Sequence, residues 1–78
     1  MEHYNEIHPR VFVHKDITID WTAYRERVNK PKVLVIRHNP TTGHTRTERK
    51  TLMAAVLDSW SMSKRPRYAN YIFYILNP

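Results

Sequence analysis

The chain has 78 residues, with thirteen Lys and Arg against seven Asp and Glu, a formal net charge of +6. It is long enough for one small domain, and the absence of cysteine excludes disulfides, zinc–thiolate sites and thiol nucleophiles. No apolar run approaches the roughly 18 residues that span a bilayer, and the N-terminal MEHYNEIHPR is unlike a secretion signal, so we expect a soluble, cytoplasmic protein with no membrane partner.

The N-terminal segment shows no hydrophobic periodicity. Residues 1–9 are therefore predicted to be a flexible arm, and residues 10–78 a single folded domain. The first segment of that domain places apolar residues at alternating positions, with a break at Lys15-Asp16, which predicts a half-buried strand. Its apolar positions are Val11, Val13, Ile17 and Ile19.

A short helix and a second strand are expected next. Asp20 is a suitable N-cap for a helix over residues 21–29, and Pro31 ends it because proline disfavours helical geometry at the residue before it. The following KVLVIRH contains four consecutive apolar residues, Val33 to Ile36, of which three are β-branched. This composition predicts a strand in the interior of a sheet.

The segment NPTTG, residues 39–43, predicts a chain reversal. Pro40 has the fixed φ of a first turn position, and Gly43, the only glycine, supplies the positive φ needed to re-enter a ladder. The returning HTRTERK has no apolar face. We therefore expect it to be an exposed edge strand, guarded by its charges against unwanted pairing.

The C-terminal third contains the clearest helix and a final strand. Thr51 can cap a helix over TLMAAVLDSW, and YIFYIL, residues 71–76, is apolar or aromatic throughout, which predicts a strand covered on both faces. The helix carries a wide apolar stripe at helical spacing. The stripe consists of Leu52, Met53, Val56, Leu57 and Trp60.

The predicted order of elements is βαββαβ, an α+β class. This order resembles the ferredoxin-like split βαβ arrangement, or a related antiparallel sheet with two helices on one face. In either case the second sheet face would be free to bind a partner.

The excess positive charge favours anionic partners, either nucleic acid (DNA or RNA) or an acidic protein surface. Basic residues collect on the hairpin and in the KRPR connection before the last strand, where a phosphate backbone could contact them. The candidate nucleic-acid-binding residues are Arg37, His44, Arg46, Arg49, Lys50, Lys64, Arg65 and Arg67. The alternative interpretation is a solvated edge strand.

The segment RHNPTTGHTRTERKTLMAAVLDSW, residues 37–60, is similar to the hairpin-then-helix unit of the arm-binding, three-stranded N-terminal domains of tyrosine recombinases. In those domains a PTTG-type turn is followed by a basic strand and a helix. Alternating threonines replace here the aromatic and basic run that those domains usually carry after the turn.

Aromatic residues crowd the last strand, where alternation places Tyr71 and Phe73 on one face and Tyr74 on the other. An exposed aromatic face could stack bases, as RNA-binding sheets do. It could equally be closed by a homodimer or by a partner protein. The candidate aromatic residues are Tyr68, Tyr71, Phe73 and Tyr74.

Five histidines are present, but their spacing lacks the helical HxxxH pair of a metal site, so we expect no metal and no cofactor. His44, Arg46 and Glu48 share a strand face and contain the residue types of a small metal-independent ribonuclease. The same alternation is typical of any exposed edge strand, so we do not expect an enzyme.

Two functions therefore remain open. The first is a small basic nucleic-acid-binding module that contacts phosphates through the hairpin and the KRPR loop. The second is a protein-binding regulator or inhibitor of a larger complex, such as a viral host-takeover protein, acting through its aromatic face or charged hairpin.

Overall fold

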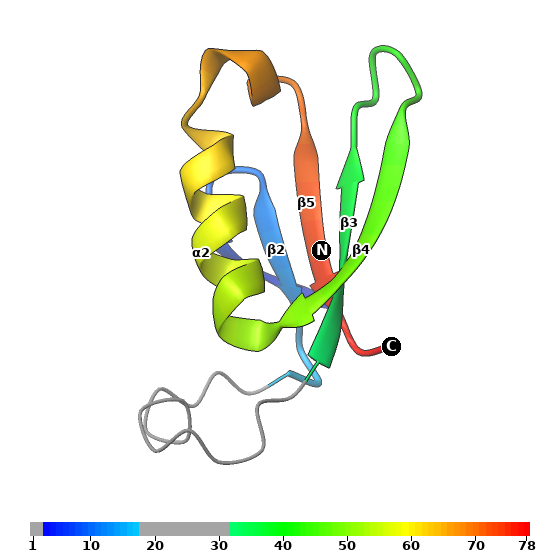
Figure 1. Cartoon of the computed structure of the whole chain (residues 1–78), viewed down its shortest axis with the longest axis vertical. Coiled ribbons are helices and arrows are strands. Elements are labelled where there is room, and N and C mark those ends of the chain that lie inside the picture. The colour runs from blue at the N-terminus through cyan, green and yellow to red at the C-terminus, as the bar shows by residue number, and fades with distance from the viewer. Residues whose placement is uncertain (1–2, 18–31) are drawn as a thin grey trace.

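The structure is a computed structural model, and it describes residues 3–17 and 32–78 (Figure 1). The helix predicted over residues 21–29 and its cap Asp20 lie outside the described residues. The described strands form a five-stranded mixed sheet in the order β1-β2-β5-β3-β4, with helix α2 on one face. The elements are β1 (Tyr4–His8), β2 (Val11–His14), β3 (Lys32–His38), β4 (Thr45–Thr51), α2 (Leu52–Ser63), the 3-10 helix η1 (Pro66–Tyr68) and β5 (Ile72–Leu76).

The strand directions confirm the α+β class but not the ferredoxin-like arrangement. β3 runs antiparallel to both β4 and β5, so β4 and β5 are parallel with β3 between them, and α2 connects them as a split βαβ unit. β2 runs parallel to β5 and therefore antiparallel to β3. A ferredoxin-like fold requires a second parallel unit there, and the described strands do not form it.

The N-terminal segment differs from the predicted arm. Residues 4–8 form strand β1, which pairs antiparallel with β2 through partners such as Tyr4 and His14. A ladder is held by backbone hydrogen bonds, which need no apolar alternation in the sequence. The Tyr4 ring adds an edge contact to Tyr74, at 5.4 Å between centroids. The β1–β2 turn places Arg10 at φ 67, the left-handed region that is costly for a residue with a side chain.

The core lies between the sheet and α2. Alternate residues of β2, β3 and β5 point toward the helix and are buried, as the apolar alternation predicts. β3 and β5 are interior strands, and the outward-facing residues of β5 are half-buried rather than fully covered. The buried apolar residues are Val11, Val13, Val33, Val35, Ala55, Val56, Phe73 and Ile75.

Helix α2 begins as predicted but turns a different face to the sheet. The Thr51 hydroxyl accepts a hydrogen bond from Ala54 N at 3.4 Å, which is the expected N-cap. Leu57 and Trp60, predicted to be buried in the apolar stripe, are 48% and 43% exposed. The buried face is made mainly of small residues that let the helix lie close to the sheet. They are Ala55, Val56, Ser59 and Ser63.

The hairpin between β3 and β4 confirms the predicted reversal. Gly43 has φ 78 and its N–H donates to Asn39 O at 2.7 Å. Asn39 Oδ1 accepts from the N–H groups of Thr41 and Thr42, so the side chain replaces missing backbone partners inside the turn. β4 follows as an edge strand.

Neither helix in the described part of the chain is long and apolar enough to cross a membrane.

Candidate nucleic-acid interface

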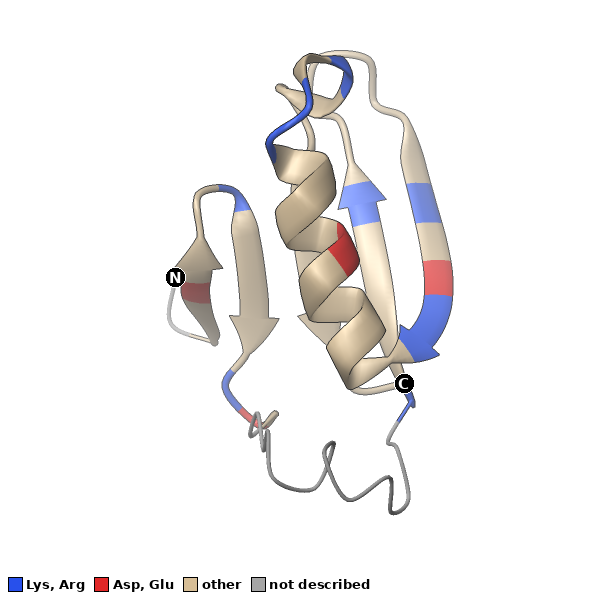
Figure 2. Cartoon of the chain, turned by 60° about the vertical axis from the view of Figure 1, so that its left-hand side comes forward, with Lys and Arg blue, Asp and Glu red and all other residues tan. Residues whose placement is uncertain are grey.

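Cations from two separate segments meet at one end of the molecule. Arg37 lies on β3 and Arg67 lies in η1, and both guanidinium carbons lie over the ring of Tyr68, at 5.4 and 5.6 Å from its centroid. Arg37 is also the register partner of Arg46 on β4. Figure 2 shows Lys and Arg in the segment after α2 and on the neighbouring parts of β3 and β4. We call Arg37, Arg46, Lys64, Arg65 and Arg67 the basic rim.

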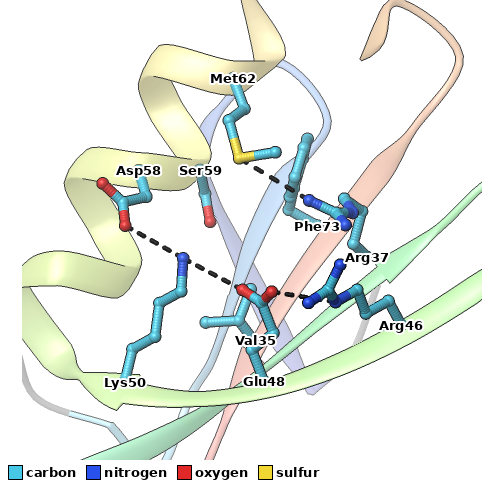
Figure 3. Close-up of a pocket in the computed structure, with 9 residues that line it drawn as sticks. All are labelled: Val35, Arg37, Arg46, Glu48, Lys50, Asp58, Ser59, Met62 and Phe73. Atoms are coloured by element: carbon cyan, nitrogen blue, oxygen red, sulfur yellow. Dashed lines mark hydrogen bonds and ion pairs between the residues drawn. The ribbon is translucent and has the colours of Figure 1, made fainter.

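Arg37 is the innermost cation of the rim. Its side chain is half-buried and its Nε has no hydrogen-bond partner, while Nη1 lies 4.0 Å from the sulfur of Met62 (Figure 3). The ring of Tyr71, at 5.9 Å, provides a second aromatic contact. Aromatic faces and a thioether are weak partners for a guanidinium, and the unpartnered Nε is itself buried, so what Arg37 adds to the rim is its positive charge.

A network of opposite charges joins β4 to α2 (Figure 3). Glu48 accepts from Arg46 Nε at 3.0 Å and from Lys50 Nζ at 3.1 Å, and Lys50 also reaches Asp58 at 3.0 Å. The hydrogen bond from Lys50 is the main cause that lowers the pKa of Glu48, and the charges of Lys50, Arg46 and Arg37 add to it against the opposing effect of burial. Lys50 is thereby occupied by two carboxylates, whereas Arg46 is paired with Glu48 alone and its side chain stays mostly exposed.

The pKa of Lys50 is raised. Partial burial alone would lower it, but the hydrogen bonds to Asp58 and Glu48 and the charges of these carboxylates outweigh the burial. Lys50 therefore stays protonated and bridges the strand and the helix throughout the neutral range.

A small cleft opens between β4 and α2. Arg37, Arg46 and Lys50 line it together with the carboxylates of the network, and the buried Ser59 and Phe73 lie deeper (Figure 3). The cleft admits about one water-sized object, so it is too small for an organic substrate.

Lys64, Arg65 and Arg67 follow the C-terminus of α2. The Lys64 ammonium lies 3.6 Å from the centroid of the exposed Trp60 ring. Among the described residues, the carboxylates that pair with Lys or Arg are Glu48 and Asp58, and neither contacts this segment. Cations are favourable at a helix C-terminus because they face the negative end of the helix dipole.

The structure brings together only part of the predicted binding set. His44 stands beside the rim, with its ring 6.4 Å from that of Tyr71. Arg49 is the register partner of Leu34 and so lies on the sheet face opposite α2. Lys50 is held by the charge network described above. Arg46 and Arg49 are three residues apart on β4, so strand alternation alone places them on opposite faces of the sheet. The sequence does not show which of the two faces α2 covers, because that depends on the tertiary fold.

The predicted aromatic residues do not form one face. Tyr68 and Tyr71 are half-buried and pack against the core, while Phe73 is 1% exposed and cannot stack a base. Tyr74 lies on the opposite sheet face, stacked on Phe12 at 5.8 Å between centroids. The aromatic residue that the sequence interpretation missed is Trp60. Small residues at a spacing of four, Ala55, Ser59 and Ser63, were the signal that α2 could pack through another face.

The described part of the chain contains no group of three or more His, Asp or Glu side chains that could hold a metal ion. No family model, no curated protein and no solved structure matches this chain. The likeness of residues 37–60 to recombinase arm-binding domains is one of local order, a hairpin followed by a helix, and the structure has that order as β3, β4 and α2.

Proposed function

We propose that this chain is a nucleic-acid-binding module whose basic rim contacts the phosphate backbone. One observation carries the proposal: Arg37 from the hairpin and Arg67 from η1 both lie over the Tyr68 ring, so cations from segments distant in sequence gather around one aromatic side chain. A phosphate backbone presents negative charges at regular intervals, and a cluster of cations can contact several of them.

The surroundings of the rim support the same ligand. Arg65 and Arg67 are exposed, and the half-buried Arg37 adds its positive charge beside Arg67. Guanidinium groups donate paired hydrogen bonds that fit phosphate oxygens. Backbone contacts of this kind position the ligand without reading its sequence, so we expect modest sequence preference and strong salt dependence.

The test is a fluorescence anisotropy titration of labelled single-stranded and duplex oligonucleotides at several salt concentrations. Arg65→Glu combined with Arg67→Glu is expected to abolish binding without unfolding the domain, because both side chains are exposed. Lys15→Glu combined with Lys32→Glu changes the charge equally at the other end of the sheet, where β2 ends and β3 begins. The proposal fails if no oligonucleotide binds, or if both double variants weaken binding equally.

The second candidate function, a protein-binding regulator, is favoured by the sheet face opposite α2. Phe12 and Tyr74 stack there, and Leu34 and Ile36 are half-buried on the same face. A Tyr74→Glu variant would disrupt a protein contact at this face and leave the basic rim unchanged. Salt-insensitive self-association that Tyr74→Glu removes would favour this function over the first.

A further inference from the structure

We infer that the nucleic acid at the basic rim is single-stranded and that one of its bases stacks on Trp60. This inference rests on the proposed function and adds to it the class of nucleic acid and the residue that selects it. The inference starts from Trp60, whose side chain is predicted from the sequence to be buried but is exposed in the structure.

Trp60 is an exposed ring in a basic setting. It lies in the last turn of α2, is 43% exposed, and has the Lys64 ammonium 3.6 Å from its ring centroid. Leu57, one turn earlier, is also exposed, but Asp58 and Ser61 are exposed on the same helix, so Trp60 is the exposed ring of a mixed surface. An aromatic ring that is exposed beside cations is typical of surfaces that bind single strands, because bases stack on the ring while the cations contact phosphates.

The indole is also held in place. The His8 ring meets it edge-on, at 6.0 Å between centroids, and His8 Nδ1 lies 3.1 Å from Ser63 Oγ. The Ser63 hydroxyl in turn donates to Trp60 O at 2.8 Å. The buried Ser63 thus links His8, whose ring contacts the indole, to the backbone of Trp60. The edge contact with His8 restricts the ring, and a stacking platform that is restricted before binding loses less conformational freedom when a base arrives.

The position of Trp60 favours unpaired bases. In a duplex both faces of a base are covered by its neighbours, so an indole on a helix surface has no face to stack on. A single strand exposes these faces, and stacking on an aromatic ring tolerates any sequence. As a base covers the ring, the Lys64 ammonium is displaced toward a phosphate, and Arg65 and Arg67 follow in the chain to contact the next ones.

The experiment compares Trp60→Ala, Trp60→Tyr and Leu57→Ala in anisotropy titrations with a single-stranded oligonucleotide and with its duplex. Trp60→Ala is expected to weaken single-strand binding about 5- to 150-fold, which corresponds to about 1–3 kcal/mol for one stacked base. Trp60→Tyr keeps a ring and is expected to retain most of the affinity. Leu57→Ala removes an exposed apolar neighbour without removing a ring, and is expected to leave binding unchanged. Thermal melts check that all variants stay folded.

The outcomes separate the two proposals. If Arg65→Glu with Arg67→Glu abolishes binding but Trp60→Ala has no effect and duplex binds as tightly as single strand, this inference is overturned and the proposed function stands. If no oligonucleotide binds wild-type protein, the proposed function fails and the inference with it. If sedimentation shows an oligomer that Trp60→Ala dissociates, Trp60 is a protein contact, which also overturns the inference. Fluorescence quenching by oligonucleotide that is lost in Trp60→Tyr supports it.

Discussion

Replacing Glu48 with Gln is expected to lower stability and to strengthen polyanion binding. Gln keeps the shape of the side chain and removes the charge that accepts from Arg46 at 3.0 Å and Lys50 at 3.1 Å. The Arg46 side chain is 61% exposed, so that pair contributes little, and Lys50 keeps Asp58. Exposed pairs are each worth about 0.2–1 kcal/mol, so we expect the free energy of unfolding to fall by about 0.5–1 kcal/mol, or about 2–8 °C in Tm.

The pH dependence identifies the charge as the cause. Because the pKa of Glu48 is lowered in the folded state, its contribution is complete above the unfolded value near 4.5 and is lost as the pH falls through the folded pKa. The difference between wild type and Glu48→Gln should therefore be full at neutral pH and vanish in acid. Urea denaturation at a series of pH values measures it. A difference that stays constant into acid would refute the ion-pair explanation.

Binding is expected to move in the opposite direction. Glu48→Gln raises the formal charge from +6 to +7 and releases Arg46 toward the ligand, so affinity should rise at low salt. If the freed Arg46 gains a phosphate contact, the slope of log K against log salt steepens by about 0.7–0.9. Asp58→Asn is the matched control, because it removes another carboxylate partner of Lys50 and raises the net charge equally, but from α2. Equal effects of the two variants would show that Arg46 is not at the interface.

Two further predictions concern the fold. Phe73→Ala leaves a cavity at a position that is 1% exposed on an interior strand, and it is expected to lower the free energy of unfolding by about 3–5 kcal/mol in urea denaturation. A decrease below about 1 kcal/mol would mean that the core is not packed around this ring. Gly43→Ala adds a methyl group with no atom within 4 Å but forces φ 78 on a residue with a Cβ, so we expect about 1–2 kcal/mol of destabilisation from backbone strain alone. An unchanged Tm in Gly43→Ala would show that the turn is not held at that conformation.

Local chemistry made several elements predictable from the sequence. The consecutive apolar residues Val33 to Ile36 identified an interior strand, and Pro40 with Gly43 identified the reversal that follows. Thr51 identified the start of α2. Each of these signals acts within a few residues, through side-chain periodicity, a required φ or a cap. The residues that specify the element therefore lie in the element itself or directly beside it in the sequence.

The candidate site depended on longer-range packing. The sequence indicated which segments are basic, but it could not show that Arg37 and Arg67 meet at Tyr68 or that Arg49 lies on the opposite sheet face. These placements depend on which strands become neighbours, and strand pairing is determined by contacts across the whole sheet rather than within any one segment.

The sequence by itself determined the class of the fold, the charge that favours anionic partners, the hairpin and the start of the long helix. Only the tertiary structure decided the strand order, the pairing of residues 4–8 as β1, and the face that α2 turns inward. The sequence predicted that the large apolar residues of α2 would face the sheet, but the face that packs against it carries the small residues Ala55 and Ser59, which allow close packing. This packing leaves Trp60 exposed beside the basic rim.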